Sequence, residues 1–185
     1  MDMDLKSTAI HEAGHAVATE RFMLGQWETS IVPNHEFGTA GHCTGEDNPQ
    51  DEDLSKENVK VYLAGYAALV VAGYSEEESC RGAGDDFEKA IDEIRFISGG
   101  DLDYWKQQTV AFMSEPANAH AVTALSEALI DNLTLCGDEV FIVIDAADEG
   151  DNPKQVLDAV RKLRSKKPLT QDDISILQGT KTGDC

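Results

Sequence analysis

Basic residues are scarce in this chain, which has 15 lysines and arginines against 35 aspartates and glutamates and a formal net charge of −20. A nucleic-acid-binding surface needs a basic footprint, and an anionic membrane surface attracts clusters of lysine and arginine. We therefore expect neither nucleic acid nor a membrane as a partner. The excess of acidic residues indicates a soluble, self-repelling surface.

Long apolar runs and paired cysteines are missing as well. The longest apolar stretch, residues 59–74, includes Lys60 and is too short to span a membrane, so it predicts a buried helix. The four cysteines are widely spaced without a C-x-x-C pair, which argues against a structural zinc site and against a disulfide framework. The N-terminal Met-Asp-Met-Asp lacks the apolar core of a signal peptide. We expect a cytoplasmic protein with reduced thiols.

Histidine is also rare, yet two of the five histidines lie four residues apart in the H-E-A-G-H segment of residues 11–15. Positions i and i+4 share one face of an α-helix, so the imidazoles of His11 and His15 can reach a single metal ion. Glu12 then lies beside the open side of that ion, where it can accept a proton from a water molecule that the metal activates. The motif predicts a zinc metallopeptidase in which His11 and His15 bind Zn²⁺ and Glu12 is the catalytic base.

The sequence around this motif suits a buried helix over residues 4–23. Its neighbours are small or apolar, and Asp2, Asp4 and Ser7 are suitable N-terminal caps. Gly14 costs about 1 kcal/mol relative to alanine in a helix interior. A glycine at this position therefore predicts that another element packs very closely against the helix.

Hydrophobic periodicity and turn residues predict an α+β fold that is mainly α-helical, with a small β-sheet beside the active-site helix. Residues 138–147 are ambiguous, because their centre is rich in β-branched residues whereas their neighbours have a helical pattern. Ser55 is expected to cap the second helix, and residues 46–53 and 76–84 to form polar loops. The predicted helices are 4–23, 55–73, 85–98, 102–113, 116–133 and 153–166, with a short one after Thr170, and the predicted strands are 28–32 and 39–44.

The helix motif supplies two metal ligands, whereas a catalytic zinc ion usually takes three and keeps one position for water. The metzincin pattern would place a third histidine at position 21, which is Arg21. His35, His42, His120 and many carboxylates remain candidates, and spacing alone does not choose among them.

Several segments resemble, in the same order, the peptidase domain of the FtsH family of ATP-dependent zinc proteases. Over roughly residues 5–145 the resemblance implies a zincin-like metallopeptidase domain, assigned here to residues 1–150. The segments that carry it are 8–18 (the family's H-E-A-G-H-A), 30–33 with Gly41 (its strand-turn-strand), 64–68 (its G-G-R-A-A-E), 82–90 (its G-A-x-N-D-[IL]-x-x-A) and 133–139 (its E-T-L-x-G-x-E).

The resemblance makes Asp86 the third zinc ligand. The local sequence agrees, because Gly82 and Gly84 permit an unusual backbone path into the start of a helix. Two adjacent aspartates, Asp85 and Asp86, allow one to cap that helix while the other binds the metal. Glu88 is the alternative ligand.

The family's ATPase module and membrane helices have no counterpart in this sequence. The resemblance therefore implies an ATP-independent zinc endopeptidase that cuts peptides or unfolded proteins, acting as a homo-oligomer or with a separate ATPase partner. The strand over 39–44 is expected to align substrate by β-augmentation, and His42 on it is interpreted as an ordinary histidine, with contact to substrate or a second metal as the alternative. Residues 151–185 are expected to form a C-terminal helical extension. The alternative function is a non-catalytic, metal-stabilised interaction or regulatory module.

Overall fold

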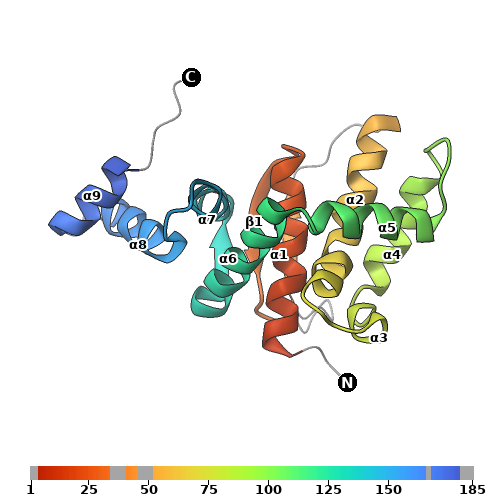
Figure 1. Cartoon of the computed structure of the whole chain (residues 1–185), viewed down its shortest axis with the longest axis horizontal. Coiled ribbons are helices and arrows are strands. Elements are labelled where there is room, and N and C mark those ends of the chain that lie inside the picture. Colours follow the sequence, from red (N-terminus) through yellow and green to blue (C-terminus); the bar gives the residue numbers. More distant parts are fainter. Residues whose placement is uncertain (1–3, 34–40, 46–51, 166–167, 180–185) are drawn as a thin grey trace.

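The computed structural model describes residues 4–33, 41–45, 52–165 and 168–179 (Figure 1). Helices dominate these ranges, and the strands found in them form one antiparallel sheet in the order β2-β1-β3. The predicted α+β, mainly helical class with a small sheet is therefore confirmed. In chain order the elements are α1 (Leu5–Arg21), β1 (Gln26–Ser30), β2 (His42–Gly45), α2 (Glu52–Val71), α3 (Glu76–Ser79), α4 (Gly84–Ile94), α5 (Leu102–Met113), α6 (Pro116–Asn132), β3 (Thr134–Cys136), α7 (Gly137–Glu149), α8 (Pro153–Arg164) and α9 (Gln171–Gly179).

Helix α1 lies in the middle of the molecule, where α2, α6 and the sheet pack around it (Figure 1). The helix begins at a cap in which the Asp4 carboxylate accepts a 2.8 Å hydrogen bond from the Ser7 backbone N–H. Every residue from Ser7 to Thr19 is buried. The small side chains of this segment let neighbouring helices approach from several sides, so the H-E-x-x-H motif sits inside the protein.

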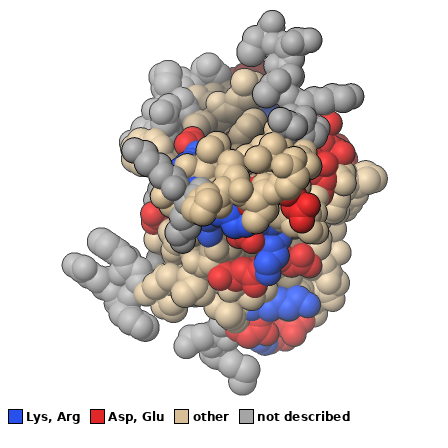
Figure 2. Space-filling view, turned by 90° about the vertical axis from the view of Figure 1, so that its left-hand side faces the viewer, with Lys and Arg blue, Asp and Glu red and all other residues tan. Residues whose placement is uncertain are grey.

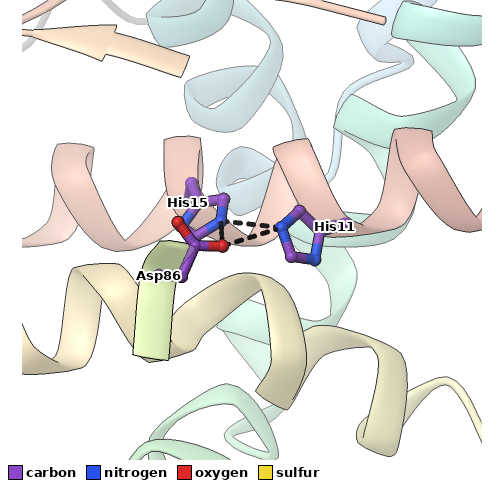
Figure 3. A group of neighbouring side chains, drawn as sticks. All are labelled: His11, His15 and Asp86. Atoms are coloured by element: carbon purple, nitrogen blue, oxygen red, sulfur yellow. Dashed lines mark hydrogen bonds and ion pairs between the residues drawn. The ribbon is translucent and has the colours of Figure 1, made fainter. Parts of the chain in front are cut away.

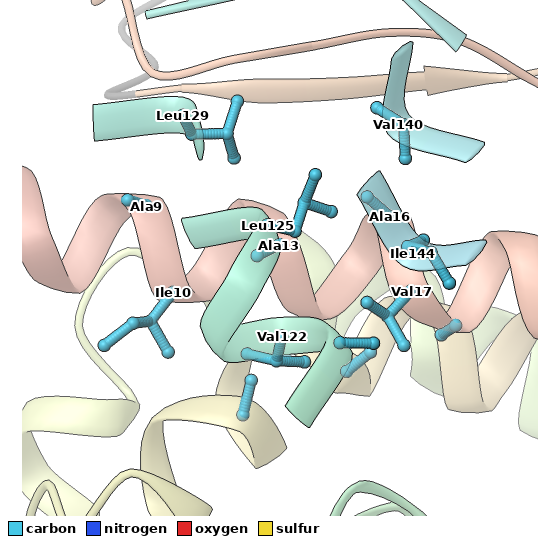
Figure 4. Packing of buried hydrophobic residues seen from close by; sticks show 14 of the residues in the cluster. Ala9, Ile10, Ala13, Ala16, Val17, Val122, Leu125, Leu129, Val140 and Ile144 are labelled. Carbon is cyan, nitrogen blue, oxygen red and sulfur yellow. The ribbon is translucent and has the colours of Figure 1, made fainter. Parts of the chain in front are cut away.

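The main core forms where α1 meets α6 and α7 (Figure 4). Alanines and a valine of α1 face branched side chains of the other two helices, a combination that allows close packing without large voids. The residues labelled there are Ala9, Ile10, Ala13, Ala16, Val17, Val122, Leu125, Leu129, Val140 and Ile144.

Gly14 marks the closest approach of α1 and α2. A Cβ atom at this position would lie 2.5 Å from the carbonyl oxygen of Ala64 and 2.7 Å from the Cβ of Ala68. Both distances are too short for non-bonded atoms, so only glycine allows this crossing. The close packing predicted from the helix-interior glycine is confirmed.

The small sheet lies against α1, with β1 at its centre. Ser30 of β1 lies opposite His42 of β2 on one side and opposite Thr134 of β3 on the other. The two predicted strands exist with shifted bounds, although residues 39 and 40 of the second lie outside the described residues. β3 was not predicted, because a strand of three residues is too short to show a periodic pattern.

One ambiguous segment is a helix, and two local predictions are wrong. Residues 138–147, which the sequence left open between strand and helix, belong to helix α7, whose start is capped by the Glu139 carboxylate on the Cys136 N–H and whose end is the left-handed Gly150. Ser55 does not cap α2, because that helix begins at Glu52 and Ser55 is buried within it. The expected loop over 76–84 contains the short helix α3, which begins with a capping box.

Helices α8 and α9 extend from α7 at one end of the molecule (Figure 1). Basic and acidic side chains are mixed on this end (Figure 2), and ion pairs tie the helices together. Arg161 of α8 binds Glu139 of α7 at 2.7 Å, and Lys162 binds Asp173 of α9 at 2.8 Å. Within the described ranges, no helix combines the length and apolarity that crossing a membrane requires.

Candidate metal centre

Side chains of two helices converge on one face of α1 (Figure 3). The Nε2 atoms of His11 and His15 are 3.0 Å apart, and Oδ2 of Asp86 from α4 lies 3.1 Å from the first and 3.2 Å from the second. Ligands bound tetrahedrally to zinc at about 2.0 to 2.1 Å lie about 3.3 Å from one another. The three atoms therefore form a triangle of nearly the size that one such ion requires.

The orientation of His15 places the lone pair of its Nε2 atom towards the carboxylate of Asp86. Its Nδ1 lies 2.8 Å from the backbone carbonyl oxygen of Val61, to which it donates a hydrogen bond. In the neutral imidazole, that bond places the lone pair on Nε2, which faces the Asp86 carboxylate. Two electron-pair donors at 3.2 Å repel each other unless a proton or a metal ion lies between them. The donor set thus fits a metal ion.

Two glycines shape the walls of this site. A Cβ on Gly65 of α2 would lie 2.5 Å from Cε1 of His11 and 2.6 Å from Nε2 of His15. A Cβ on Gly41, which precedes β2, would lie 2.8 Å from Oε1 of Glu12. In the sequence, both glycines served only as parts of the family resemblance, and their contacts were not predicted. Gly65 lies inside a predicted helix, as Gly14 does, and by the same argument it could have indicated a close contact.

The carboxylate of Asp86 and the imidazole of His15 hold opposite charges in the absence of metal. Burial by itself lowers the pKa of His15, but the charge and hydrogen bond of Asp86, helped by Glu12 and the Val61 carbonyl, raise it to about 9. Burial raises the pKa of Asp86, whereas His15 and His11 together lower it far more, so it ends well below its usual range. A proton therefore occupies the place that a metal ion would take.

Glu12 lies inside the protein beside the two histidines, with 7% of its surface exposed. Burial raises its pKa above the usual value for glutamate, and the nearby His15 and His11 only partly oppose this shift. A buried carboxyl with a raised pKa next to a metal-binding group is a typical general acid–base candidate. Cys43 is also close to Glu12, but burial above all raises its thiol pKa to about 12. Cys43 does not belong to the group of His11, His15 and Asp86.

Asp86 reaches the histidines from the first turn of α4. Gly82, with φ of +80°, takes the unusual backbone conformation that its sequence suggested just before this helix. Neither of the two adjacent aspartates is the cap that the sequence allowed, because the N-cap is Ala83 and no side-chain capping hydrogen bond is made there. Both carboxylates of Asp85 and Asp86 instead lie in the first turn, where the helix dipole favours negative charge.

The other candidate ligands lie elsewhere. His42 on β2 pairs with Glu28 of β1 at 3.1 Å, and His120 is exposed on α6. Glu88 does not join the group of His11, His15 and Asp86, which is the one metal-binding cluster found within the described ranges. His35 lies outside the described residues.

No family model and no curated protein matches the chain. The likeness to the FtsH peptidase domain therefore rests on the motifs themselves and stays a prediction, as does the zincin-like fold.

Proposed function

We propose that this protein is a zinc metalloendopeptidase that hydrolyses peptide bonds in short or unfolded polypeptides without ATP. One observation carries the proposal: donor atoms of His11 and His15 on the buried helix α1 and of Asp86 on α4 lie 3.0 to 3.2 Å apart, with the carboxyl of Glu12 on the same buried helix. Two imidazoles and one carboxylate are a ligand set used by catalytic zinc sites, which keep the fourth position open.

The proposed chemistry divides between the metal and Glu12. Zinc held by these residues supplies Lewis-acid activation of a water molecule and of the peptide carbonyl. Glu12 accepts a proton from the attacking water and then delivers it to the leaving amine nitrogen. Its burial supports both roles, because the raised pKa of its carboxyl brings proton uptake closer to neutral pH.

The sheet supports a preference for extended peptides. β2 occupies one edge of the order β2-β1-β3, and no strand in the described residues pairs with its outer side. A substrate chain can add to such an edge through backbone hydrogen bonds. These bonds require an extended backbone but do not depend on which side chains the substrate carries. Gly41, directly before β2, lies against Glu12, so this strand begins next to the proposed catalytic carboxyl. Folded proteins offer few segments of this kind.

The test is Glu12→Gln beside the wild type, with zinc content and cleavage of an unfolded fluorescent protein measured on the same samples. The substitution keeps the size of the side chain and removes its proton-accepting charge, so zinc should stay bound while kcat falls at least about 100-fold. Equal turnover by the two proteins would overturn the role of Glu12. Bound zinc without any cleavage by the wild type would favour the non-catalytic metal-stabilised module.

A further inference from the structure

Asp86 lies in the first turn of α4, a helix that packs along α2. α4, which is described over its whole length, has no side-chain cap at its start, and its buried residues are Ala90 and Glu93. Both lie at least one turn beyond Asp86. The carboxylate of Asp86 nevertheless approaches two nitrogen atoms within 3.2 Å. A contact within the first turn would fix the position of this carboxylate most directly.

That contact is made by Phe87, the residue after Asp86. Its ring packs edge-on against the ring of Tyr66 from α2, with centroids 5.6 Å apart. The ammonium group of Lys106 from α5 lies 4.3 Å from the centroid of Tyr66 and 5.3 Å from that of Phe87. A cation within about 6 Å of an aromatic face is attracted to it, so Lys106 draws the two rings together.

Lys106 is itself fixed by Glu76 of α3. Its Nζ donates a 2.6 Å hydrogen bond to Oε1 of Glu76, while the Tyr66 hydroxyl donates a 2.5 Å bond to Oε2 of the same carboxylate. Only 16% of the Lys106 side chain is exposed, whereas 63% of the Glu76 side chain is, so the cation is held inside the protein by a carboxylate at the surface. The four side chains form one closed group, which we call the Lys106 cluster: Tyr66, Glu76, Phe87 and Lys106.

The Lys106 cluster adjoins the metal centre at two points of the chain. Tyr66 follows Gly65, which packs on both histidines, and Phe87 follows Asp86. We infer that Lys106 is a positioning residue for the metal centre, because it clamps the ring beside Asp86 to the ring beside Gly65. It touches neither the metal ligands nor the proposed catalytic base. The inference rests on the proposed metal site and extends it to a residue that no motif indicates.

The test is a titration of the metal-free full-length protein with Co²⁺, read by visible absorption. Lys106→Met keeps the length of the side chain and removes its charge, and Lys106→Arg keeps a cation over the rings. We expect Lys106→Met to weaken Co²⁺ binding about 2- to 30-fold, the size of the cation–π attraction that it removes, and to alter the tetrahedral absorption band. Lys106→Arg should recover most of the affinity.

Lys60→Met is the matched control, since Lys60 also lies over two rings, those of Phe22 and Phe112, at 5.6 and 5.9 Å. It should bind Co²⁺ as the wild type does. Wild-type affinity and spectrum in Lys106→Met would overturn the inference, and so would an equal loss in Lys60→Met. If Lys106→Met does not fold, Phe87→Leu replaces it, with the same expectation and the same overturning result.

The same titration separates this inference from the proposed function. Tight Co²⁺ binding by the wild type, lost in Asp86→Ala, supports the metal centre whatever Lys106→Met does. A wild type that binds no Co²⁺ overturns the metal centre and the role of Lys106 together.

Discussion

At the scale of single residues, the metal centre depends on a glycine that has no side chain as much as on the side chains that bind. Gly65 gives the two imidazoles the space in which their Nε2 atoms approach within 3.0 Å. Such a contact cannot be predicted from a motif, because it joins residues about fifty positions apart. The motif predicts which side chains bind, whereas the packing of α2 decides whether they can meet.

Gly65→Ala should therefore weaken metal binding. The new methyl group would lie 2.5 to 2.6 Å from atoms of His11 and His15 and must push them aside. Overpacking of this kind costs about 1 to 3 kcal/mol, which corresponds to roughly a 5- to 150-fold loss if it falls on the bound state. Zinc affinity by competition with a chelating dye is the measurement. Gly84→Ala, where a Cβ meets nothing within 4 Å, is the control, and equal affinities would contradict the contact.

Metal binding should release a proton at neutral pH. In the metal-free protein the pKa of His15 is about 9, so its imidazole is protonated at pH 7, but a metal needs it neutral. The apparent affinity should therefore rise about tenfold per pH unit from pH 7 and level off above pH 9. Calorimetry at pH 7 in buffers of different ionisation enthalpy measures the released proton. Heats that are independent of the buffer would contradict the charged state assigned to His15.

At the scale of elements, the clearest feature is the crossing of α1 and α2 at Gly14. Alanine is the better helix former by about 1 kcal/mol, yet Gly14→Ala should destabilise the fold, because its methyl group would collide with the Ala64 carbonyl. We expect a net loss of about 1 to 2 kcal/mol in the free energy of unfolding, measured by urea denaturation. An increase in stability would mean that the helices are less closely packed than described. Gly84→Ala again serves as the control.

Prediction from the sequence succeeded where one local signal dominates. The helix of the H-E-x-x-H motif, with Asp4 as its cap, and the close approach at Gly14 follow from residues near one another in the chain. The β-branched run at 140–144 left its segment ambiguous, and the caps at Glu139 and Gly150 together with burial on one helical face decide in favour of α7. The meeting of Asp86 with the histidines came from resemblance alone, since no local pattern joins α1 to α4.

At the scale of the whole molecule, the net charge of −20 is opposed only locally by ion pairs such as those of α8 and α9. Self-repulsion of this size destabilises the compact state and is screened by salt. Raising the salt concentration from about 0.01 M to about 0.1 M shortens the Debye length from about 30 Å to about 10 Å. The Tm measured by calorimetry should therefore rise over this range. A fall would mean that the ion pairs contribute more to stability than the repulsion removes.

The central claim is that His11, His15 and Asp86 together hold one zinc ion, and the zinc content of the purified protein tests it most directly. Wild type and Asp86→Ala would be prepared side by side, loaded with Zn²⁺, desalted and measured by elemental analysis. The geometry predicts one zinc per chain in the wild type and a sharp loss in the variant, because two imidazoles alone hold the metal weakly. No zinc in the wild type, or one tightly bound zinc in Asp86→Ala, would contradict the account.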